Sequence, residues 1–177
     1  MIVSDTGPLI SVFQSGSFPL LHALIGDVVV PKAVADEIIQ HGWLNDLAAA
    51  GEKIRVVELE TDEHAKATEV ADAIGASDPL SHLSHRGEAE AIVLACRQTE
   101  LCELIFIDEL AARNYATKMG LRVTRFPGIL LMATRTKVLS PENLKSRLES
   151  CRDQGTYYGQ QLIEDVYQMA QTVWRQS

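Results

Sequence analysis

Two aspartates follow apolar segments that are predicted to form buried strands. Asp5 comes directly after Ile2-Val3, and Asp108 follows the apolar run 104–107. A carboxylate at the end of a buried strand costs free energy unless it is paired or binds a metal, although a single aspartate there can also cap the next helix. Because ligands of open α/β sheets bind outside the carboxyl ends of the strands, we expect these two aspartates to share a site.

A third carboxylate is predicted to lie beside the core face of a helix. Residues 31–41 have helical spacing, with Val34 and Ile38 on the buried stripe. At 100° per residue, Glu37 lies about 60° from Val34, whereas Asp36 lies about 160° away. Glu37 is therefore expected to border the core and Asp36 to point to water, although a glutamate at such a boundary can also reach solvent or pair with a lysine.

Two further glutamates begin the Ala-rich segment 87–99, which is predicted to be a helix. Glu88 and Glu90 lie about 200° apart around such a helix, so they cannot both face one point. Glutamates in a first turn also favour the helix dipole without any catalytic role. Because the segment is apolar nearly all round, periodicity does not choose between the two.

Other chemistries fit only fragments of this pattern. The tripeptide Asp5-Thr6-Gly7 is the signature of aspartic proteases, but these need an all-β chain with two such loops or a symmetric dimer, and helices dominate here. A phosphoaspartate phosphatase needs a second aspartate two residues after the first, where this chain has glycine. His82, His85 and Glu88 have a spacing that could bind zinc, but the histidines lie in a predicted loop and are expected to be surface residues.

The elements that position these residues alternate as in an α/β domain. Strands are predicted at 2–3, 27–30, 54–57, 104–107 and 121–123, and a loop at 75–86. Strands separated by helices indicate a central, mainly parallel sheet. Helices are predicted at 9–24, in pieces broken around Gly16 and Pro19, and at 31–41, 61–74, 87–99, 109–119, 127–135, 141–151 and 160–174.

The composition is that of an ordinary globular protein. The 177 residues fit one domain, with 46% apolar residues and a net charge of −8. No apolar run approaches the roughly 18 residues of a membrane span, no signal peptide is visible, and three cysteines without metal-type spacing suggest reduced thiols. We therefore expect a cytoplasmic protein. The charge is uneven, because residues 111–152 carry nine Lys and Arg but two Asp and Glu. This segment could bind a polyanion or be an ordinary solvated face.

Four short segments contain the acidic residues in order. Together they resemble the PIN-domain nucleases over roughly residues 1–135, and most closely the small prokaryotic branch found in toxin–antitoxin modules. The turn after the last strand, 124–128, keeps only part of the pattern of that branch. The matching segments are VSDTGPLI at 3–10, VADEI at 34–38, GEAEAI at 87–92 and FIDELAAR at 106–113.

The resemblance implies a Rossmann-like, three-layer α/β/α fold with acidic residues at one edge of a mainly parallel sheet. It implies a single domain over 1–177, with a core at about 1–135 and a helical extension at about 136–177. Glu88 would be a neighbour of the site, and Ser4 and Thr6 would be hydroxyl supports beside Asp5. By position, the four acids it implies are Asp5, Glu37, Glu90 and Asp108.

The resemblance also implies a Mg²⁺- or Mn²⁺-dependent ribonuclease. Hard divalent cations prefer carboxylate oxygens, and one or two such ions would relieve the repulsion among four carboxylates. A metal-activated water would hydrolyse an RNA phosphodiester and leave 5′-phosphate and 3′-hydroxyl ends. Asp5, Glu90 and Asp108 are expected to hold metal directly or through water, and Glu37 to complete the shell or to help position the attacking water.

The expected partners are RNA, a small antitoxin protein and a second copy of the chain. The apolar, aromatic helix at 160–174 offers a surface for a homodimer or packs on its own core. The alternative function is a non-catalytic PIN-like domain used for binding or assembly, which the presence of all four acids argues against. The candidate RNA phosphate contacts are Arg113, Lys118, Arg122 and Arg125.

Overall fold

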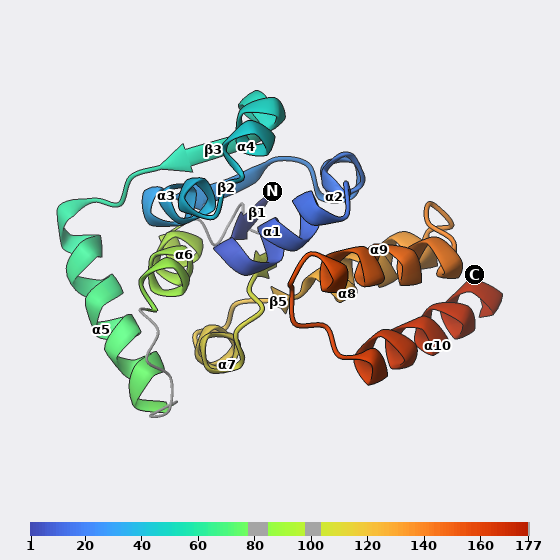
Figure 1. The fold of residues 1–177 in the computed structure, drawn as a ribbon. Helices are drawn as coiled ribbons and strands as arrows, with labels where there is room; N and C mark the ends of the chain where they lie inside the picture. The colour runs from blue at the N-terminus through green and yellow to red at the C-terminus, as the bar shows by residue number, and fades with distance from the viewer. Residues whose placement is uncertain (78–84, 98–103, 177) are drawn as a thin grey trace.

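Five short parallel strands form a sheet in the centre of the molecule (Figure 1). The computed structural model describes residues 1–77, 85–97 and 104–176. Neighbouring strands are parallel throughout, and the strand order reverses between β1 and β4. Within the described residues the order is β3-β2-β1-β4-β5, formed by β1 (Ile2–Ser4), β2 (Val28–Pro31), β3 (Ile54–Val57), β4 (Leu104–Phe106) and β5 (Val123–Thr124).

Alternate residues of the strands build two separate cores. Ile2 and Phe106 pack into the core on one face of the sheet, whereas Val3 and Ile105 pack into the core on the other. Because successive strand side chains point to opposite faces, a sheet covered on both sides needs strands that are apolar at every position. The runs of β2 and β4 meet this requirement, whereas the edge strand β3 contains the exposed Arg55.

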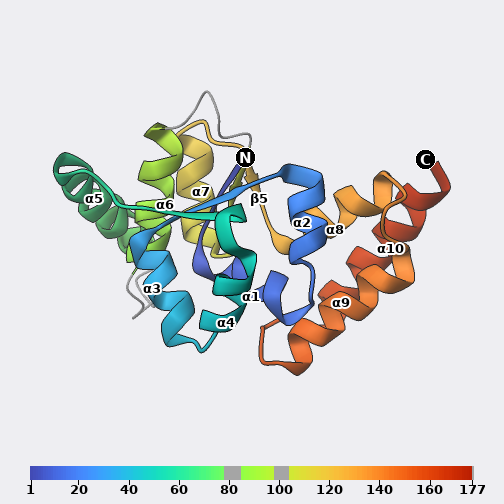
Figure 2. The same cartoon turned by 90° about the horizontal axis from the view of Figure 1, so that it is seen from above.

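Helices cover both faces of the sheet. One core contains side chains of α5 (Thr61–Ser77), α6 (Arg86–Arg97) and α7 (Leu110–Lys118). Figure 2 shows these three helices on one side of the sheet and α8 to α10 on the other. The second core contains side chains of α1 (Thr6–Gln14), α2 (Phe18–Ile25), α3 (Lys32–Gln40), α8 (Phe126–Arg135), α9 (Pro141–Asp153) and α10 (Gln160–Gln176). The predicted three-layer α/β fold is thereby confirmed. Among the described helices, none combines the length and apolar character that crossing a membrane requires.

Several element boundaries differ from the predicted ones. Helix α1 begins at Thr6 rather than at residue 9, and Pro31 ends β2 instead of opening the next helix. Helix α4 (Leu44–Ala50) has no predicted counterpart, because only its last residue is buried. It leads through the turn η1 (Gly51–Lys53) to β3. Helix α5 continues through Ser77 into the predicted loop 75–86, of which residues 78–84 lie outside the described part.

The C-terminal helices share the core that α1 and the sheet build. Leu144 and Leu148 of α9 are fully buried in it. Polar bonds fasten α9 to the end of α1: Arg147 donates to Ser15 O at 2.8 Å, and Ser150 Oγ donates to Gln14 O at 3.2 Å. The helical extension is therefore held against the helix that follows Asp5.

Gly128, in the first turn of α8, allows this helix to lie close to β5. A Cβ atom at residue 128 would lie 2.7 Å from Thr124 Oγ1, closer than non-bonded carbon and oxygen atoms tolerate. We expect Gly128→Ala to lower the free energy of unfolding by about 1–3 kcal/mol, although alanine is the better helix former, because the contact forces a shift. Denaturant unfolding measures the change.

Thr124→Ala removes the clashing oxygen and provides the matched background. Adding Gly128→Ala to that variant should cost little stability or increase it. An equal loss in both backgrounds would show that the close approach is not the cause.

Candidate active site

Asp5 lies where β1 ends and is held by the neighbouring strand. Its backbone N–H donates to Phe106 O of β4 at 2.9 Å. It precedes α1, but its side chain makes no capping hydrogen bond. Only 5% of the residue is exposed. The capping explanation therefore does not apply, and a buried carboxylate in this position needs another partner.

Asp108 lies beyond the end of β4, the strand next to β1. Helix α7 is capped by Glu109, which accepts hydrogen bonds from two backbone N–H groups, so Asp108 does not serve as the cap. Asp108 Oδ1 is 3.4 Å from Arg125 Nε, and its Oδ2 is 3.4 Å from the hydroxyl of Tyr158. The two aspartates thus meet where the strand order reverses, the place at which open α/β sheets bind ligands.

Glu37 reaches the same place from α3. Thr6 Oγ1 donates a hydrogen bond to Glu37 Oε2 at 2.5 Å. Gly87, at the start of α6, lies against two acids, because a Cβ atom there would be 3.1 Å from Glu37 Oε2 and 3.2 Å from Asp5 Oδ1. The missing side chain leaves room for both carboxylates at one helix end. Asp36 is exposed, as the helical phase predicted, and it pairs with Lys32.

The side chains of Glu88 and Glu90 lie in different surroundings in the structure. Glu88 is partly buried, and its charge acts on Asp5 more strongly than that of any other neighbouring carboxylate. Glu90 is buried elsewhere on α6, where its Oε1 lies 2.8 Å from Arg86 Nε and its side chain lines a cavity shared with α5. Of the two glutamates, it is thus Glu88 whose charge acts on Asp5, whereas Glu90 pairs with Arg86. The acids that gather at the ends of β1 and β4 are Asp5, Glu37, Glu88 and Asp108.

Burial and mutual repulsion raise the pKa of these carboxyls. Burial raises the pKa of Asp5 well above its ordinary value, and the charges of Glu88, Glu37 and Asp108 add to the rise. Burial likewise raises the pKa of Glu88, with the charge of Glu37 contributing. Burial also raises the pKa of Asp108, although Arg125 opposes this. The site therefore concentrates negative charge that its own side chains do not neutralise.

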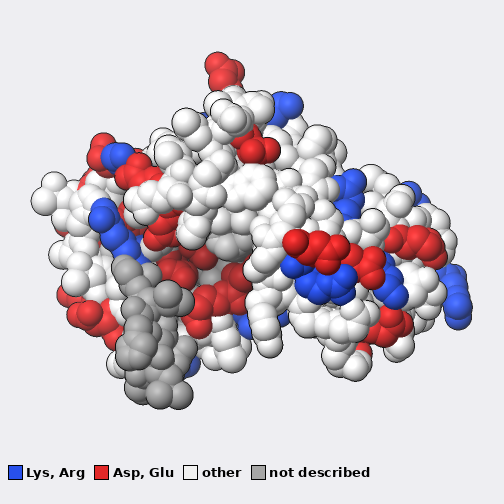
Figure 3. All heavy atoms as spheres, in the orientation of Figure 1, with Lys and Arg blue, Asp and Glu red and all other residues white. Residues whose placement is uncertain are grey.

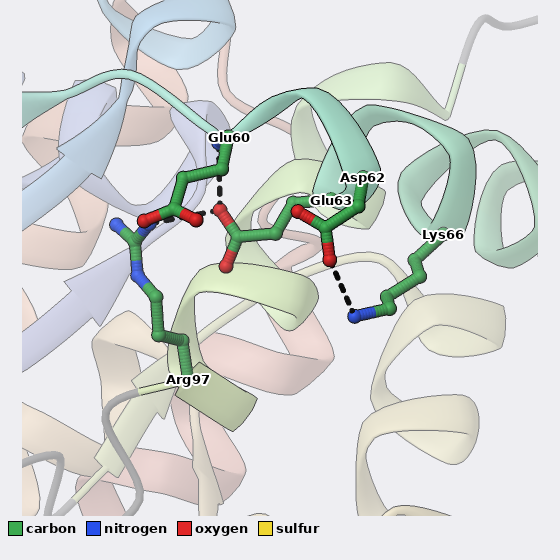
Figure 4. Close-up of polar contacts among 5 residues, drawn as sticks. All are labelled: Glu60, Asp62, Glu63, Lys66 and Arg97. Atoms are coloured by element: carbon green, nitrogen blue, oxygen red, sulfur yellow. Dashed lines mark hydrogen bonds and ion pairs between the residues drawn. The ribbon is translucent and has the colours of Figure 1, made fainter.

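A second group of carboxylates shows how the chain neutralises a buried acid elsewhere. Glu63 on α5 is buried, but Arg97 NH1 lies 2.8 Å from its Oε2, and Glu60 N–H donates to the same oxygen at 2.8 Å (Figure 4). The neighbouring Asp62 pairs with Lys66 at 3.2 Å. Within the described residues, Asp5 has no lysine or arginine at ion-pair distance. Among the buried acids of the described ranges, Glu63 and Glu90 have an arginine partner and Asp5 has none.

The side chains at this edge are of the chemical type that binds a hard divalent cation. Acidic side chains gather in the region between α1, α6 and α7 (Figure 3). Carboxylate oxygens are the ligands that Mg²⁺ and Mn²⁺ prefer. No three His, Cys, Asp or Glu side chains of the described chain already form a closed metal-binding group, so binding an ion requires the carboxylates to draw together.

The zinc alternative gains no support from the described residues. His85 is buried, and neither of its ring nitrogens has a hydrogen-bond partner. His82 lies outside the described part of the chain. A metal-binding group of three side chains around His85 is absent from the part of the chain that the structure describes.

The structure brings two of the four candidate phosphate contacts to the acidic edge. Arg125 lies at Asp108, and Arg113 is close enough for its charge to act on Asp108 and on Arg125. Arg113 Nε is buried and has no hydrogen-bond partner within the described ranges. Lys118 ends α7 and Arg122 precedes β5, which places both at the opposite, amino edge of the sheet.

Tyr158 contacts the site but is absent from the residues that sequence reasoning selected. It lies between α9 and α10, 50 residues beyond Asp108. The flanking Gly155 and Gly159 mark a turn there, which is the only local signal. Which residue of such a turn reaches a distant carboxylate depends on how the helices dock.

Comparison with known proteins identifies one matching family. A family model for the PIN domain matches residues 1–172 of the chain. No protein in the curated set matches it significantly. The matched range includes β1 to β5 and the four gathered acids, and it extends through most of α10.

Removing the charge of Asp5 should stabilise the metal-free fold. We expect Asp5→Asn, measured with a chelator at pH 7.5, to raise the free energy of unfolding by about 1 kcal/mol or more, equal to about 2–4 °C in Tm. The reason is that a buried, repelled carboxylate becomes a neutral group of the same shape. Thermal unfolding measures the gain.

The gain should depend on pH. Because the folded state raises the pKa of Asp5 above its ordinary value of 3.8, the folded state binds more protons than the unfolded state, and wild-type stability falls as pH rises. The gain should therefore vanish near pH 3 and grow toward pH 7. Asp36→Asn, which removes an exposed charge on α3, is the control and should give no gain. A stability of Asp5→Asn at or below that of the wild type at pH 7.5 contradicts the prediction.

Proposed function

Because the chain belongs to the PIN-domain family, we propose that it is a metal-dependent endoribonuclease. PIN domains are typically nucleases that use divalent metal ions and act on nucleic acid. The observation that carries the proposal is the gathering of carboxylates without sufficient cations where the strand order reverses. A buried group of this kind is destabilising by itself, and its retention is accounted for by a bound cation.

We assign the metal to three of the carboxylates. Asp5, Glu88 and Asp108 would hold one or two Mg²⁺ or Mn²⁺ ions directly or through water, and Glu37 would complete the group. A bound ion supplies an activated water and stabilises charge on the phosphate under attack. Glu88 takes the place of Glu90 in this assignment because Glu90 is engaged by Arg86.

Two hydroxyl groups support this arrangement. Thr6 fixes one oxygen of Glu37 through its short hydrogen bond. Ser4 Oγ donates to Asp5 O at 2.8 Å, which steadies the backbone where β1 becomes α1. These bonds limit the directions that the acids can take, and the acids therefore need less ordering when an ion binds.

Arg113 and Arg125 would bind RNA phosphates beside the acids. Two guanidinium groups lie near Asp108, and Glu109 also acts on Arg113, so positive charge lies next to the acids at this corner of the site. Arginine binds phosphate through several N–H groups. Binding through such contacts weakens as salt increases.

The biological setting proposed here follows the branch that the sequence resembles. We place the chain, as one domain over 1–177, in the cytoplasm as the toxin of a toxin–antitoxin pair. Its partners would be a small antitoxin protein and a second copy of the chain. The non-catalytic binding or assembly function remains the alternative outcome of the experiment below.

Cleavage of a mixed single-stranded RNA pool tests the proposal. The wild type with Mn²⁺ should produce 5′-phosphate and 3′-hydroxyl ends, and a chelator should stop the reaction. Asp5→Asn and Asp108→Asn should reduce cleavage to the background of the assay, because each removes a metal ligand. Asp36→Asn should cleave like the wild type. Equal cleavage by Asp5→Asn would exclude this site, and RNA binding without cleavage by the wild type would favour the non-catalytic function.

A second pair of variants separates the two glutamates of α6. Glu88→Gln should lower kcat by roughly 100-fold, as loss of a group acting on transition-state charge does, with no loss of thermal stability. Glu90→Gln should keep kcat within a few-fold of the wild type but lower Tm, because it breaks the ion pair with Arg86. Initial rates and melting curves on the same preparations give both quantities, and the opposite pattern would return Glu90 to the site.

A further inference from the structure

Tyr158 belongs to the C-terminal extension and contacts the acidic site. Only 3% of this residue is exposed, and its ring belongs to the core built by α1, α8, α9 and α10. Its hydroxyl lies 3.1 Å from Ser11 Oγ on α1 and 3.4 Å from Asp108 Oδ2. A buried hydroxyl thus bridges the first helix of the chain and a carboxylate of the site.

The turn that presents Tyr158 is fastened to α1 independently of the ring. Gly155, with φ of 98°, ends α9 in a conformation that favours glycine. Gln154 Nε2 then donates to Gln14 O at 2.7 Å, and Thr156 Oγ1 donates to Gln14 Oε1 at 2.5 Å. The position of the Tyr158 hydroxyl is therefore set by several bonds, and not by the ring alone.

The chemistry of the three groups fixes the direction of the hydrogen bonds. An ionised carboxylate only accepts, so the Tyr158 proton points to Asp108 Oδ2. The Tyr158 oxygen then accepts from Ser11, whose single hydroxyl proton is shared between this oxygen at 3.1 Å and Gly7 O at 3.3 Å. The ordinary pKa of a tyrosine hydroxyl is about 10, so it is protonated at neutral pH and acts as a donor. Arg125 holds the other oxygen of Asp108.

We propose that Tyr158 is a positioning residue that orients Asp108 for metal binding. Held at both oxygens, the carboxylate of Asp108 keeps a fixed rotation beside Asp5, and each oxygen retains a lone pair for an ion. The residue that completes the site thus comes from the extension beyond residue 135. This inference rests on the proposed function, because it concerns how the same site binds its metal.

Tyr158→Phe tests the proposal by removing one oxygen atom while keeping the ring in the core. Calorimetric titration with Mn²⁺ alone should show affinity weakened by roughly 10–100-fold, the usual effect of losing a partner that orients a ligand. With RNA, kcat should fall while KM changes little. Tyr157→Phe is the matched control, because the neighbouring tyrosine is 97% exposed, and it should behave like the wild type in both measurements.

An Asp108→Asn background shows whether Tyr158 acts through Asp108. In that background Tyr158→Phe should cause no further loss of Mn²⁺ affinity, since the group that it orients is already changed. A full additional loss there, or wild-type Mn²⁺ affinity in Tyr158→Phe alone, overturns the proposal.

Ser11→Ala shows whether a folding defect explains the result for Tyr158→Phe. It leaves Tyr158 in place but removes the bond that steadies its hydroxyl, and it should weaken Mn²⁺ binding by a smaller factor than Tyr158→Phe. If both variants lower Tm but bind Mn²⁺ like the wild type, Tyr158 has only a structural role and the proposal fails. If the wild type itself neither binds Mn²⁺ nor cleaves RNA, the proposed function fails instead, so the two failures are distinguishable.

Discussion

The gathering of one buried and three half-buried carboxylates is the constraint around which this structure is arranged. Asp5 and Asp108 lie side by side because β1 and β4 are neighbours, and helices α3 and α6 bring Glu37 and Glu88 to the same place. Every one of these acids would be better solvated if it were exposed. The parallel sheet makes the gathering possible, since the carboxyl ends of its strands lie along one edge, and its two apolar cores provide the stability that the acids reduce.

Small local choices adapt the chain to this constraint. Glycine at residue 87 lets two carboxylates approach the start of α6, and the hydroxyl of Thr6 satisfies one oxygen of Glu37. The buried acid Glu63, by contrast, has an arginine as its ion-pair partner and accepts a hydrogen bond from a backbone N–H. The contrast separates an acid that is neutralised within the fold from Asp5, which has no cation beside it among the described residues, a distinction that residue type alone does not give.

The sequence predicts those parts of the fold and site that depend on local pattern. Apolar runs of adequate length locate the strands, and the aspartates that follow them lie at one edge because parallel strands share it. The phase of Glu37 follows from a helix with one apolar stripe. Glu88 and Glu90 could not be separated in this way, because α6 is apolar nearly all round and their directions depend on how it packs against α5 and the sheet. Tyr158 could not be found either, because its contact with Asp108 depends on the docking of α9 against α1.

The contact between Ser11 and Tyr158 joins residues 147 positions apart, and this separation has a consequence for synthesis. In translation order, β1, β4 and all four acids precede the turn that follows α9. Until that turn docks on α1, Asp108 lacks one of its two protein partners. The hydroxyl that bonds Asp108 Oδ2 is therefore synthesised after every one of the acids, and the surroundings of Asp108 are complete only when these distant segments have met.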